Sequence, residues 1–350
     1  MKEIVKKDWS ELPSIWNELL DQNPVATPFQ SYEYLSLTGK GKPQRKDLFR
    51  TLGVRELNLV LYADAVPVAI APLLYKRRNG KTTVYFRGHF TVANQLDFIY
   101  ADLSYDDFRF FMDGIRDLLG NVSFFLDRVY GKSQTSGYLK KYLVSAEIQE
   151  HESFAIRIPD HYDDWYTGLH KSRREKLNNI KNRVTKDNVQ FSVKVYAGEK
   201  IDSRVYHKMM FTYVGRFLVK NHFRFGPLQY FVQKVLQLYL LKDKTSRYLN
   251  STGSAFHVIV YMNHEIAAFT SGLIGKDKRM IGNRLAINTK YGRYSPGVVL
   301  LSSTIRYLAE QKEAGKTDVE ILDMGQGGDG GMSYKTAYGG DIYYNYSFME

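Results

Sequence analysis

A basic, aromatic turn stands directly before a predicted helix near the C-terminal end of the chain. Ser295 is a favourable N-cap and Pro296 suits the first helical position, so ordinary capping explains part of this pattern. The glycines and the arginine indicate an additional role in binding an anion. Glycines allow close approach of the backbone, the arginine adds positive charge, and free N–H groups and the positive dipole at a helix start suit a pyrophosphate. We therefore predict that the turn binds an anionic cofactor through Tyr291, Gly292, Arg293, Tyr294, Ser295, Gly297 and Val298.

A second set of reactive side chains follows this helix. Asp323 ends an apolar run, a glycine-rich stretch comes after it, and Tyr334 and Lys335 follow the glycines. A carboxylate, a phenol and an amine that lie close together can exchange protons with a substrate. We predict that these three residues are catalytic.

Lysine and arginine dominate the segment 169–187, which has the spacing of a helix with only a narrow apolar stripe. One interpretation is a solvated, charged face. The other is that one side of the helix lines an anion site. The excess of basic over acidic residues favours the second, and we predict that Lys171, Arg173 and Arg174 bind substrate.

The composition limits the classes of function. The 350 residues carry a net charge of +12, which indicates an anionic partner such as a nucleotide cofactor, a nucleic acid, an acidic carrier protein or a membrane face. There is no cysteine, which excludes disulfides and thiol catalysis, and the histidines lack metal-ligand spacing, so we predict no metal. Neither a signal peptide nor an apolar stretch approaching the ~20 residues of a transmembrane helix is apparent, and we expect a soluble, cytoplasmic protein.

Two parts of the chain repeat the same order of elements. Residues 57–75 and 256–274 each read as strand, tight polar turn and strand, and a third strand, a helix and a closing strand follow both. This order predicts an α/β fold of two similar units. We place them at residues 1–150 and 151–350, because the pattern breaks near residue 150.

Four further motifs occur in sequence order along the chain. They are NPVATPFQSYEYL (23–35), which follows the Trp16 helix, NQLDFIY (94–100), LHKSRREKL (169–177) and the Asp-x-Gly to Tyr-Lys ending (323–335). Together with the turn at 291–298, they resemble the GNAT N-acyltransferase superfamily. The resemblance is closest to its doubled, Fem-like branch, whose members include acetyltransferases of cellulose and exopolysaccharide biosynthesis.

The resemblance implies two tandem GNAT-like units, each with a mixed, mostly antiparallel sheet flanked by helices. It places the pyrophosphate of acyl-CoA, most simply acetyl-CoA, at 291–298, and its pantetheine arm between strands 279–287 and 318–325. An amine then attacks the thioester directly, with Asp323 as base, Tyr334 as acid and Lys335 holding an anionic substrate. Since the first unit lacks a glycine-bearing phosphate turn, we expect it to form the acceptor side.

We therefore expect an N-acyltransferase that modifies an amine, or less readily a hydroxyl, of a small-molecule or sugar-amine precursor of the cell envelope or an exopolysaccharide. Peripheral association with an envelope synthase is compatible with this function. Acyl carrier protein is an alternative donor. The main alternative function is a Fem-type transferase that uses charged tRNA, and a remote one is a non-enzymatic basic module that binds RNA or another anion.

Overall fold

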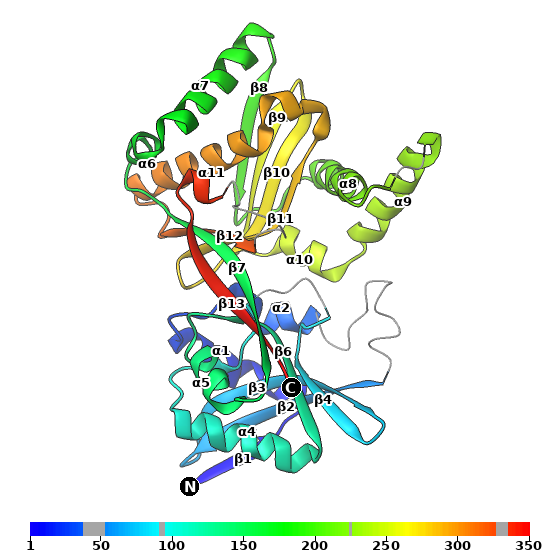
Figure 1. Ribbon diagram of the computed structural model, residues 1–350, viewed down its shortest axis with the longest axis vertical. Helices are drawn as coiled ribbons and strands as arrows, with labels where there is room; N and C mark the ends of the chain where they lie inside the picture. Colours follow the sequence, from blue (N-terminus) through cyan, green and yellow to red (C-terminus); the bar gives the residue numbers. More distant parts are fainter. Residues whose placement is uncertain (38–52, 91–94, 224–225, 327–334) are drawn as a thin grey trace. The chain divides into compact units, whose positions relative to one another are not determined.

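The structure is a computed structural model that describes residues 1–37, 53–90, 95–223, 226–326 and 335–350 (Figure 1). The chain folds into two compact units. The first contains Met1–Ser153 and Tyr343–Glu350, and the second contains Phe154–Ile342. The last strand of the chain thus belongs mainly to the first unit.

The first unit has a sheet with helices packed against it. Strands β1 to β4 and β6 neighbour one another in this order, and β13 follows β6, while β5 pairs with β3. The strands are β1 (Lys2–Lys6), β2 (Val54–Ala63), β3 (Val66–Arg78), β4 (Lys81–Phe86), β5 (Ile99–Tyr100), β6 (Val122–Tyr130), β7 (Glu147–Arg157) and β13 (Asp341–Met349). The helices are α1 (Pro13–Gln22), α2 (Tyr32–Leu37), α4 (Tyr105–Leu119) and α5 (Gln134–Tyr142).

The second unit has a sheet in the order β12-β11-β10-β9-β8. Its strands are β8 (Phe191–Ala197), β9 (Ala255–Met262), β10 (Glu265–Ile274), β11 (Arg279–Ile287) and β12 (Ile321–Gln326). Its helices are α6 (Tyr162–Gly168), α7 (Lys171–Lys186), α8 (Ser203–Lys220), α9 (Gln229–Leu241), α10 (Lys244–Ser251) and α11 (Pro296–Glu313), with a 3₁₀ turn η5 (Thr289–Tyr294) before α11.

The predicted repeat of elements is confirmed. Strands β1, β2, β3, β4 and β6 correspond to β8, β9, β10, β11 and β12, and in both units the last neighbouring pair is parallel whereas the others are antiparallel. The two corresponding hairpins also share a turn. Asp64 and Ala65 in one, and Asn263 and His264 in the other, have positive φ at both central positions, as a type I′ turn requires.

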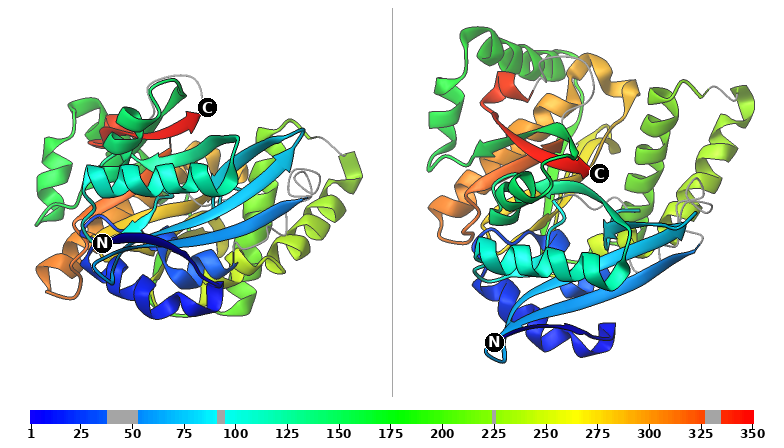
Figure 2. Two further views of the ribbon diagram at one scale, coloured as in Figure 1. Left: turned by 90° about the horizontal axis from the view of Figure 1, so that it is seen from below. Right: turned by 60° about the horizontal axis from the view of Figure 1, so that its bottom comes forward.

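Two helical layers cover the sheet of the second unit. Alternate side chains of β9, among them Phe256 and Val258, join the core under α11, while Ile259 joins the core under α8. Helices α8 and α11 accordingly lie on opposite faces of the sheet (Figure 1 and Figure 2).

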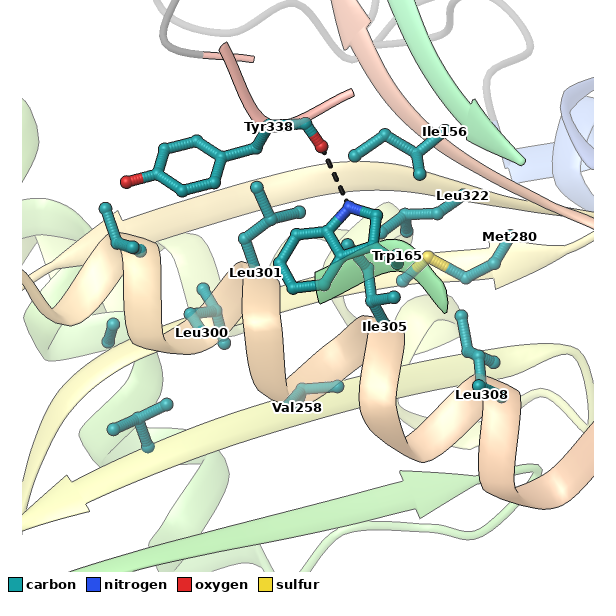
Figure 3. Packing of buried hydrophobic residues seen from close by; sticks show 14 of the residues in the cluster. Ile156, Trp165, Val258, Met280, Leu300, Leu301, Ile305, Leu308, Leu322 and Tyr338 are labelled. Atoms are coloured by element: carbon teal, nitrogen blue, oxygen red, sulfur yellow. Dashed lines mark hydrogen bonds between the residues drawn. The ribbon is translucent and has the colours of Figure 1, made fainter. Parts of the chain in front are cut away.

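Trp165 of α6 lies in the core under α11. Its ring packs among apolar side chains that include Leu301 and Ile305, and its Nε1 donates a hydrogen bond to the Tyr338 carbonyl oxygen at 3.0 Å (Figure 3). The indole therefore joins α6 and α11 to the segment that follows β12. Burial of an aromatic side chain with its polar atom satisfied is a favourable arrangement for a core.

A carboxyl group is buried in the first unit. Asp97 is 3% exposed, and its Oδ1 accepts hydrogen bonds from the Phe98 N–H at 2.8 Å and from the Thr135 hydroxyl. Burial raises the pKa of Asp97 to about 6 from its usual 3.8, against the opposite effect of these hydrogen bonds. The ionised form of Asp97 is thus disfavoured in the folded chain.

Replacement of Asp97 by Asn is expected to make stability less sensitive to pH. Because the folded pKa lies above the unfolded one, the wild type loses stability as pH rises through this interval, by about 3 kcal/mol at about pH 8. Asp97→Asn avoids this loss, so its free energy of unfolding in urea should exceed that of the wild type at about pH 8 and approach it near about pH 4. A difference that does not change with pH would contradict the effect of burial.

Candidate functional site

Strands β11 and β12 pair over a short distance and then separate. In the described chain their parallel register joins Arg279, Met280 and Ile281 to Ile321, Leu322 and Asp323. Beyond this, β11 continues to Ile287 and β12 to Gln326 without further partners in the register. We call the space between Gly282–Ile287 and Met324–Gln326 the strand fork. Beyond the pairing, the β11 edge has no strand partner in the register, whereas the last carbonyl groups of β12 accept hydrogen bonds from Lys335.

A β-bulge lies on β11 at the base of the strand fork. Ser271 pairs with Arg284 and Gly272 pairs with Gly282, so Asn283 has no opposite residue. The close approach requires glycine, since a Cβ on Gly272 would lie 2.1 Å from the Ile281 carbonyl oxygen. The side-chain Oδ1 and Nδ2 of Asn283 are buried and have no hydrogen-bond partner among the described residues. Buried amides are normally satisfied, so Asn283 is suited to bind a polar ligand group.

A buried ion network holds the paired ends of β11 and β12 together. The Asp323 side chain is fully buried; its Oδ2 lies 3.2 Å from Nη1 of Arg279, and its Oδ1 accepts a hydrogen bond from the Gly325 N–H at 2.8 Å. Arg279 also pairs through Nε with Asp277, whose pKa is raised by burial against the lowering effect of this arginine. The role of Asp323 as a base stays a prediction, while its burial and ion pair favour a positioning role.

Lys335 lies at the end of β12. Its Nζ donates hydrogen bonds to the carbonyl oxygens of Met324, Gly325 and Gln326 at 2.7, 3.1 and 3.0 Å. Burial lowers the pKa of Lys335 to about 8, although the nearby Asp323 acts in the opposite direction. The structure therefore brings Asp323 and Lys335 to one end of the strand fork. Tyr334 lies outside the described residues.

The predicted cofactor turn forms η5 and the start of α11. Ser295 occupies the N-cap position of α11. Its backbone is left-handed (φ 46°), however, and its side chain makes no capping hydrogen bond. The expectation that its hydroxyl caps the helix is therefore wrong. The Val298 N–H instead donates to the Ser295 carbonyl oxygen at 2.9 Å, and a Cβ on Gly297 would lie 2.7 Å from Ile287 Cδ1. The helix start is thus packed against the end of β11.

Three of the predicted cofactor residues are anchored in the protein. Tyr291 and Tyr294 are buried, and their hydroxyls donate hydrogen bonds to Glu265 at 2.9 Å and to Asp187 at 2.8 Å. Val298 is buried in the core under α11. Gly292 has open space where a side chain would stand, and Arg293 is exposed and pairs with Asp187 at 2.8 Å.

A hollow of about 230 Å³ lies between α7 and the start of α11. Its lining residues on α7 follow helical spacing, which places them on one side of the helix. The hollow is lined by Ser172, Glu175, Lys176, Asn179, Ile180, Arg183 and Ser295. The Arg183 guanidinium also donates a hydrogen bond to the Arg293 carbonyl oxygen, which ties α7 to the turn.

The three predicted substrate residues lie in the first turn of α7, beside this hollow, and do not line it. Lys171 Nζ lies 3.9 Å from Glu175, Arg174 donates to the Thr167 carbonyl oxygen at 3.4 Å, and the Arg173 guanidinium lies 5.8 Å from the Tyr338 ring centre. Sequence reasoning gave no site role to Lys176, Asn179 or Arg183. Their spacing with Ser172 along one helical face was the available signal.

The first unit has no equivalent fork in the part of its chain that is described. Strands β4 and β6 pair over Thr82–Val84 and Val122–Phe124, as β11 and β12 do in the second unit. Beyond the pairing, however, Leu96 forms a parallel bridge with Val129 of β6, and its N–H donates to the Arg128 carbonyl oxygen at 3.1 Å. A segment of the chain thus bridges to β6 at the position where, in the described residues, no strand pairs with β12.

Two other kinds of functional feature are absent from the described residues. No group of three or more His, Asp or Glu side chains is arranged to hold a metal ion. No helix of that part is both long enough and apolar enough to cross a membrane.

Several solved structures share this fold, whereas no protein-family model and no curated protein matches the sequence. FemX aligns with a TM-score of 0.57 and 10% identity, over 99% of this chain and 96% of FemX. A conserved protein of unknown function from Bacteroides thetaiotaomicron aligns with a TM-score of 0.51 and 12% identity, over 100% and 99% of the two chains. A tandem GNAT protein from the clavulanic acid biosynthesis pathway aligns at 0.49 and 12%, over 100% and 98%.

At these identities the similarity concerns the fold alone. The predicted fold class, two tandem GNAT-like units with mixed, mostly antiparallel sheets flanked by helices, is confirmed. The doubled arrangement of the two units is likewise similar to that of FemX.

Loss of Arg279 is expected to destabilise the second unit strongly. Arg279→Met leaves Asp277 and Asp323 without their shared cation, and breaking a buried ion pair in this way costs about 3–5 kcal/mol. Lys278→Met is the matched control, because it removes the neighbouring but exposed pair with Glu320. Chemical denaturation of both variants measures the difference, and equal losses would contradict the importance of the buried network.

Proposed function

We propose that this chain is an acyltransferase that takes an acyl group from acyl-CoA, with acetyl-CoA as the simplest donor. The acceptor is an amine, or less readily a hydroxyl, of a cell-envelope or exopolysaccharide precursor. The observation that carries the proposal is the strand fork and, at its base, the buried amide of Asn283, which has no hydrogen-bond partner among the described residues.

The strand fork suits the pantetheine arm of coenzyme A. The arm is an extended chain with two amide groups, and such a chain can add to an open strand edge through backbone hydrogen bonds. Asn283 supplies one more donor and one more acceptor at the position where the bulge re-aims β11. An arm of this kind explains why β11 and β12 separate and why a buried amide is left without a partner.

The turn before α11 suits the pyrophosphate of the same donor. It follows β11 directly, and Gly297 packs against Ile287 at the end of that strand, so the fork leads to the helix start. The positive end of the α11 helix dipole favours an anion there, although Pro296 has no N–H and the Val298 N–H is bound to Ser295. Lys176 and Arg183 line the adjacent hollow and add positive charge, opposed by Glu175.

The reaction forms one bond and breaks one. The acceptor nitrogen attacks the thioester carbonyl, the oxygen gains charge, and the C–S bond then breaks to release the thiolate. In this proposal a backbone N–H group at the bulge stabilises the charged oxygen. The acceptor's proton passes to a base, and the thiolate takes a proton from an acid, for which Tyr334 is proposed.

Lys335 and Asp323 contribute differently to this scheme. With its pKa near 8, Lys335 matches the range in which a thiolate is protonated, so it is a second candidate for the acid. Asp323 must leave Arg279 before it can reach a substrate, and we therefore assign it to holding β11 and β12 together.

The first unit contributes the acceptor side in this proposal. Its own chain fills the position that corresponds to the strand fork, and its sequence lacks a glycine-bearing phosphate turn. One donor is thus bound per chain. Peripheral association with an envelope synthase would supply the acceptor.

A Fem-type transferase that uses charged tRNA is the second candidate function. The structural similarity to FemX and the basic face of α7 favour it. In both candidate functions an amine attacks an activated acyl group. The two differ in the donor, which is acyl-CoA in one and charged tRNA in the other.

Calorimetric titration with acetyl-CoA and with CoA tests the proposal. We expect one binding site per chain and a Kd about tenfold higher for Asn283→Ala, since the lost hydrogen bonds of a buried amide are worth about 1–1.5 kcal/mol. Arg183→Glu should weaken binding through the pyrophosphate. Asn58→Ala, a buried asparagine of β2, is the matched control and should bind as the wild type does.

Other outcomes identify the alternatives. No binding of acetyl-CoA or CoA would reject the proposed donor and direct the search to charged tRNA or acyl carrier protein. Salt-sensitive RNA binding without any donor would support the non-enzymatic module instead.

A further inference from the structure

Helix α9 exposes its apolar residues and buries a polar one. Its sequence, QYFVQKVLQLYLL, is rich in large apolar side chains, yet its one buried residue is Gln237. Tyr230 is 68% exposed and Phe231 67%, while Leu238 and Tyr239 are about half exposed. This is the reverse of the usual pattern for a helix on a globular protein.

Glutamine side chains explain the orientation of α9. Gln233 and Gln237 are one helical turn apart, and their amides donate to the carbonyl oxygens of Phe211 (2.8 Å) and His207 on α8. Gly215 of α8 leaves room for this contact, since a Cβ there would lie 2.6 Å from Gln233 Nε2. The polar face of α9 is thereby fastened to α8, which itself packs on the sheet (Figure 1).

Further large apolar side chains are exposed at the end of α8 and in the described residues of the connection that leads to α9. We call these and the exposed apolar residues of α9 the hairpin outer face and define it by large side chains that are at least 44% exposed. These are Phe217, Val219, Phe223, Leu228, Tyr230, Phe231, Val235, Leu238 and Tyr239. Apolar side chains gathered in this way on one supersecondary element mark an interaction surface rather than scattered surface residues.

The charge of the same segment has one sign. Residues 203–242 contain no Asp and no Glu, so the chain's 37 acidic residues all lie elsewhere. The segment contains seven basic residues, which are Arg204, Lys208, Arg216, Lys220, Arg224, Lys234 and Lys242. Lys220 ends α8, Lys234 lies in the middle of α9, and Lys242 follows α9, so the cations accompany the apolar face along its length.

We propose that the hairpin outer face docks on a lipid bilayer that contains anionic lipids. Phe231 and Leu238 enter the boundary of the acyl chains, Tyr230 and Tyr239 lie at headgroup level, and the lysines pair with lipid phosphates. An acidic protein would have to match apolar side chains spread over two helices and their connection. A bilayer needs no matching shape, and its anionic surface complements a segment without any acidic residue.

Cosedimentation with vesicles tests this inference without any acyl donor. Vesicles of phosphatidylcholine alone are compared with vesicles that also contain phosphatidylglycerol. We expect the wild type to sediment with the anionic vesicles, and added salt to weaken this binding. Phe231→Ser combined with Leu238→Ser should lower the partition constant at least about tenfold, because two large apolar side chains lose their burial. Lys220→Glu combined with Lys234→Glu should lower it by about tenfold or more.

Leu118→Ser on α4 is the matched control, because Leu118 is 52% exposed outside the hairpin. All the replaced side chains are exposed, so unchanged circular dichroism is expected for every variant. The inference is overturned if the wild type does not bind anionic vesicles, if it binds both kinds equally, or if Leu118→Ser has the same effect. A dimer that light scattering detects, and that Leu238→Ser dissociates without any vesicle binding, would instead make a second copy the occupant.

Discussion

The ion pair between Arg279 and Asp323 joins the parallel strands β11 and β12, which pair with each other over only a short distance in the described chain. Their register covers three residue pairs. The buried guanidinium of Arg279 pairs with two carboxylates, Asp277 just before β11 and Asp323 on β12. A buried charge network of this kind is costly to leave incomplete, so it specifies where β11 and β12 stay together. The bulge at Asn283 follows directly, and the separation of the strands begins there.

The remaining parts of the candidate site depend on this separation. The end of β11 leads into η5 and α11, whose start packs on Ile287, while Lys335 binds the last carbonyl groups of β12. Helix α7 and its C-cap Asp187 contact the turn before α11, through Arg183 bound to the Arg293 carbonyl oxygen and through Asp187 paired with the Arg293 side chain. Each contact is modest alone, but together they fix an open strand edge, a helix start and a hollow in one unit.

The two units show how one order of elements supports different surfaces. Both have the same strand order and the same hairpin turn, yet Leu96 occupies in the first unit the edge that remains open in the second. The helices between the first two strands differ as well. In the second unit, Gln233 and Gln237 bind α9 to α8. The apolar side chains of α9 are therefore exposed and do not contribute to the core.

The sequence alone determined the order of elements and the repeat, because strand alternation and turn chemistry are local properties that the residues 57–75 and 256–274 both show. The GNAT-like fold class followed from the resemblance of its motifs to that superfamily. The sequence also predicted that one side of the basic segment 169–187 lines an anion site, but the residues it named, Lys171, Arg173 and Arg174, do not line the hollow. The backbone conformation of Ser295 and the ion pair of Asp323 were beyond its reach. A left-handed backbone and a buried ion pair with a residue 44 positions away arise only when distant segments pack.

The tertiary structure alone decided which buried polar groups of the described residues lack hydrogen-bond partners. It also decided which apolar side chains are exposed to solvent. Asn283 is an ordinary strand residue in the sequence, and within the described residues its amide lacks a partner because of the bulge and the separation of β12. The apolar residues of α9 are exposed because Gln233 and Gln237 bond to α8 instead. In both cases the physical reason is the same: burial is a property of neighbours, and neighbours are set by packing rather than by position along the chain.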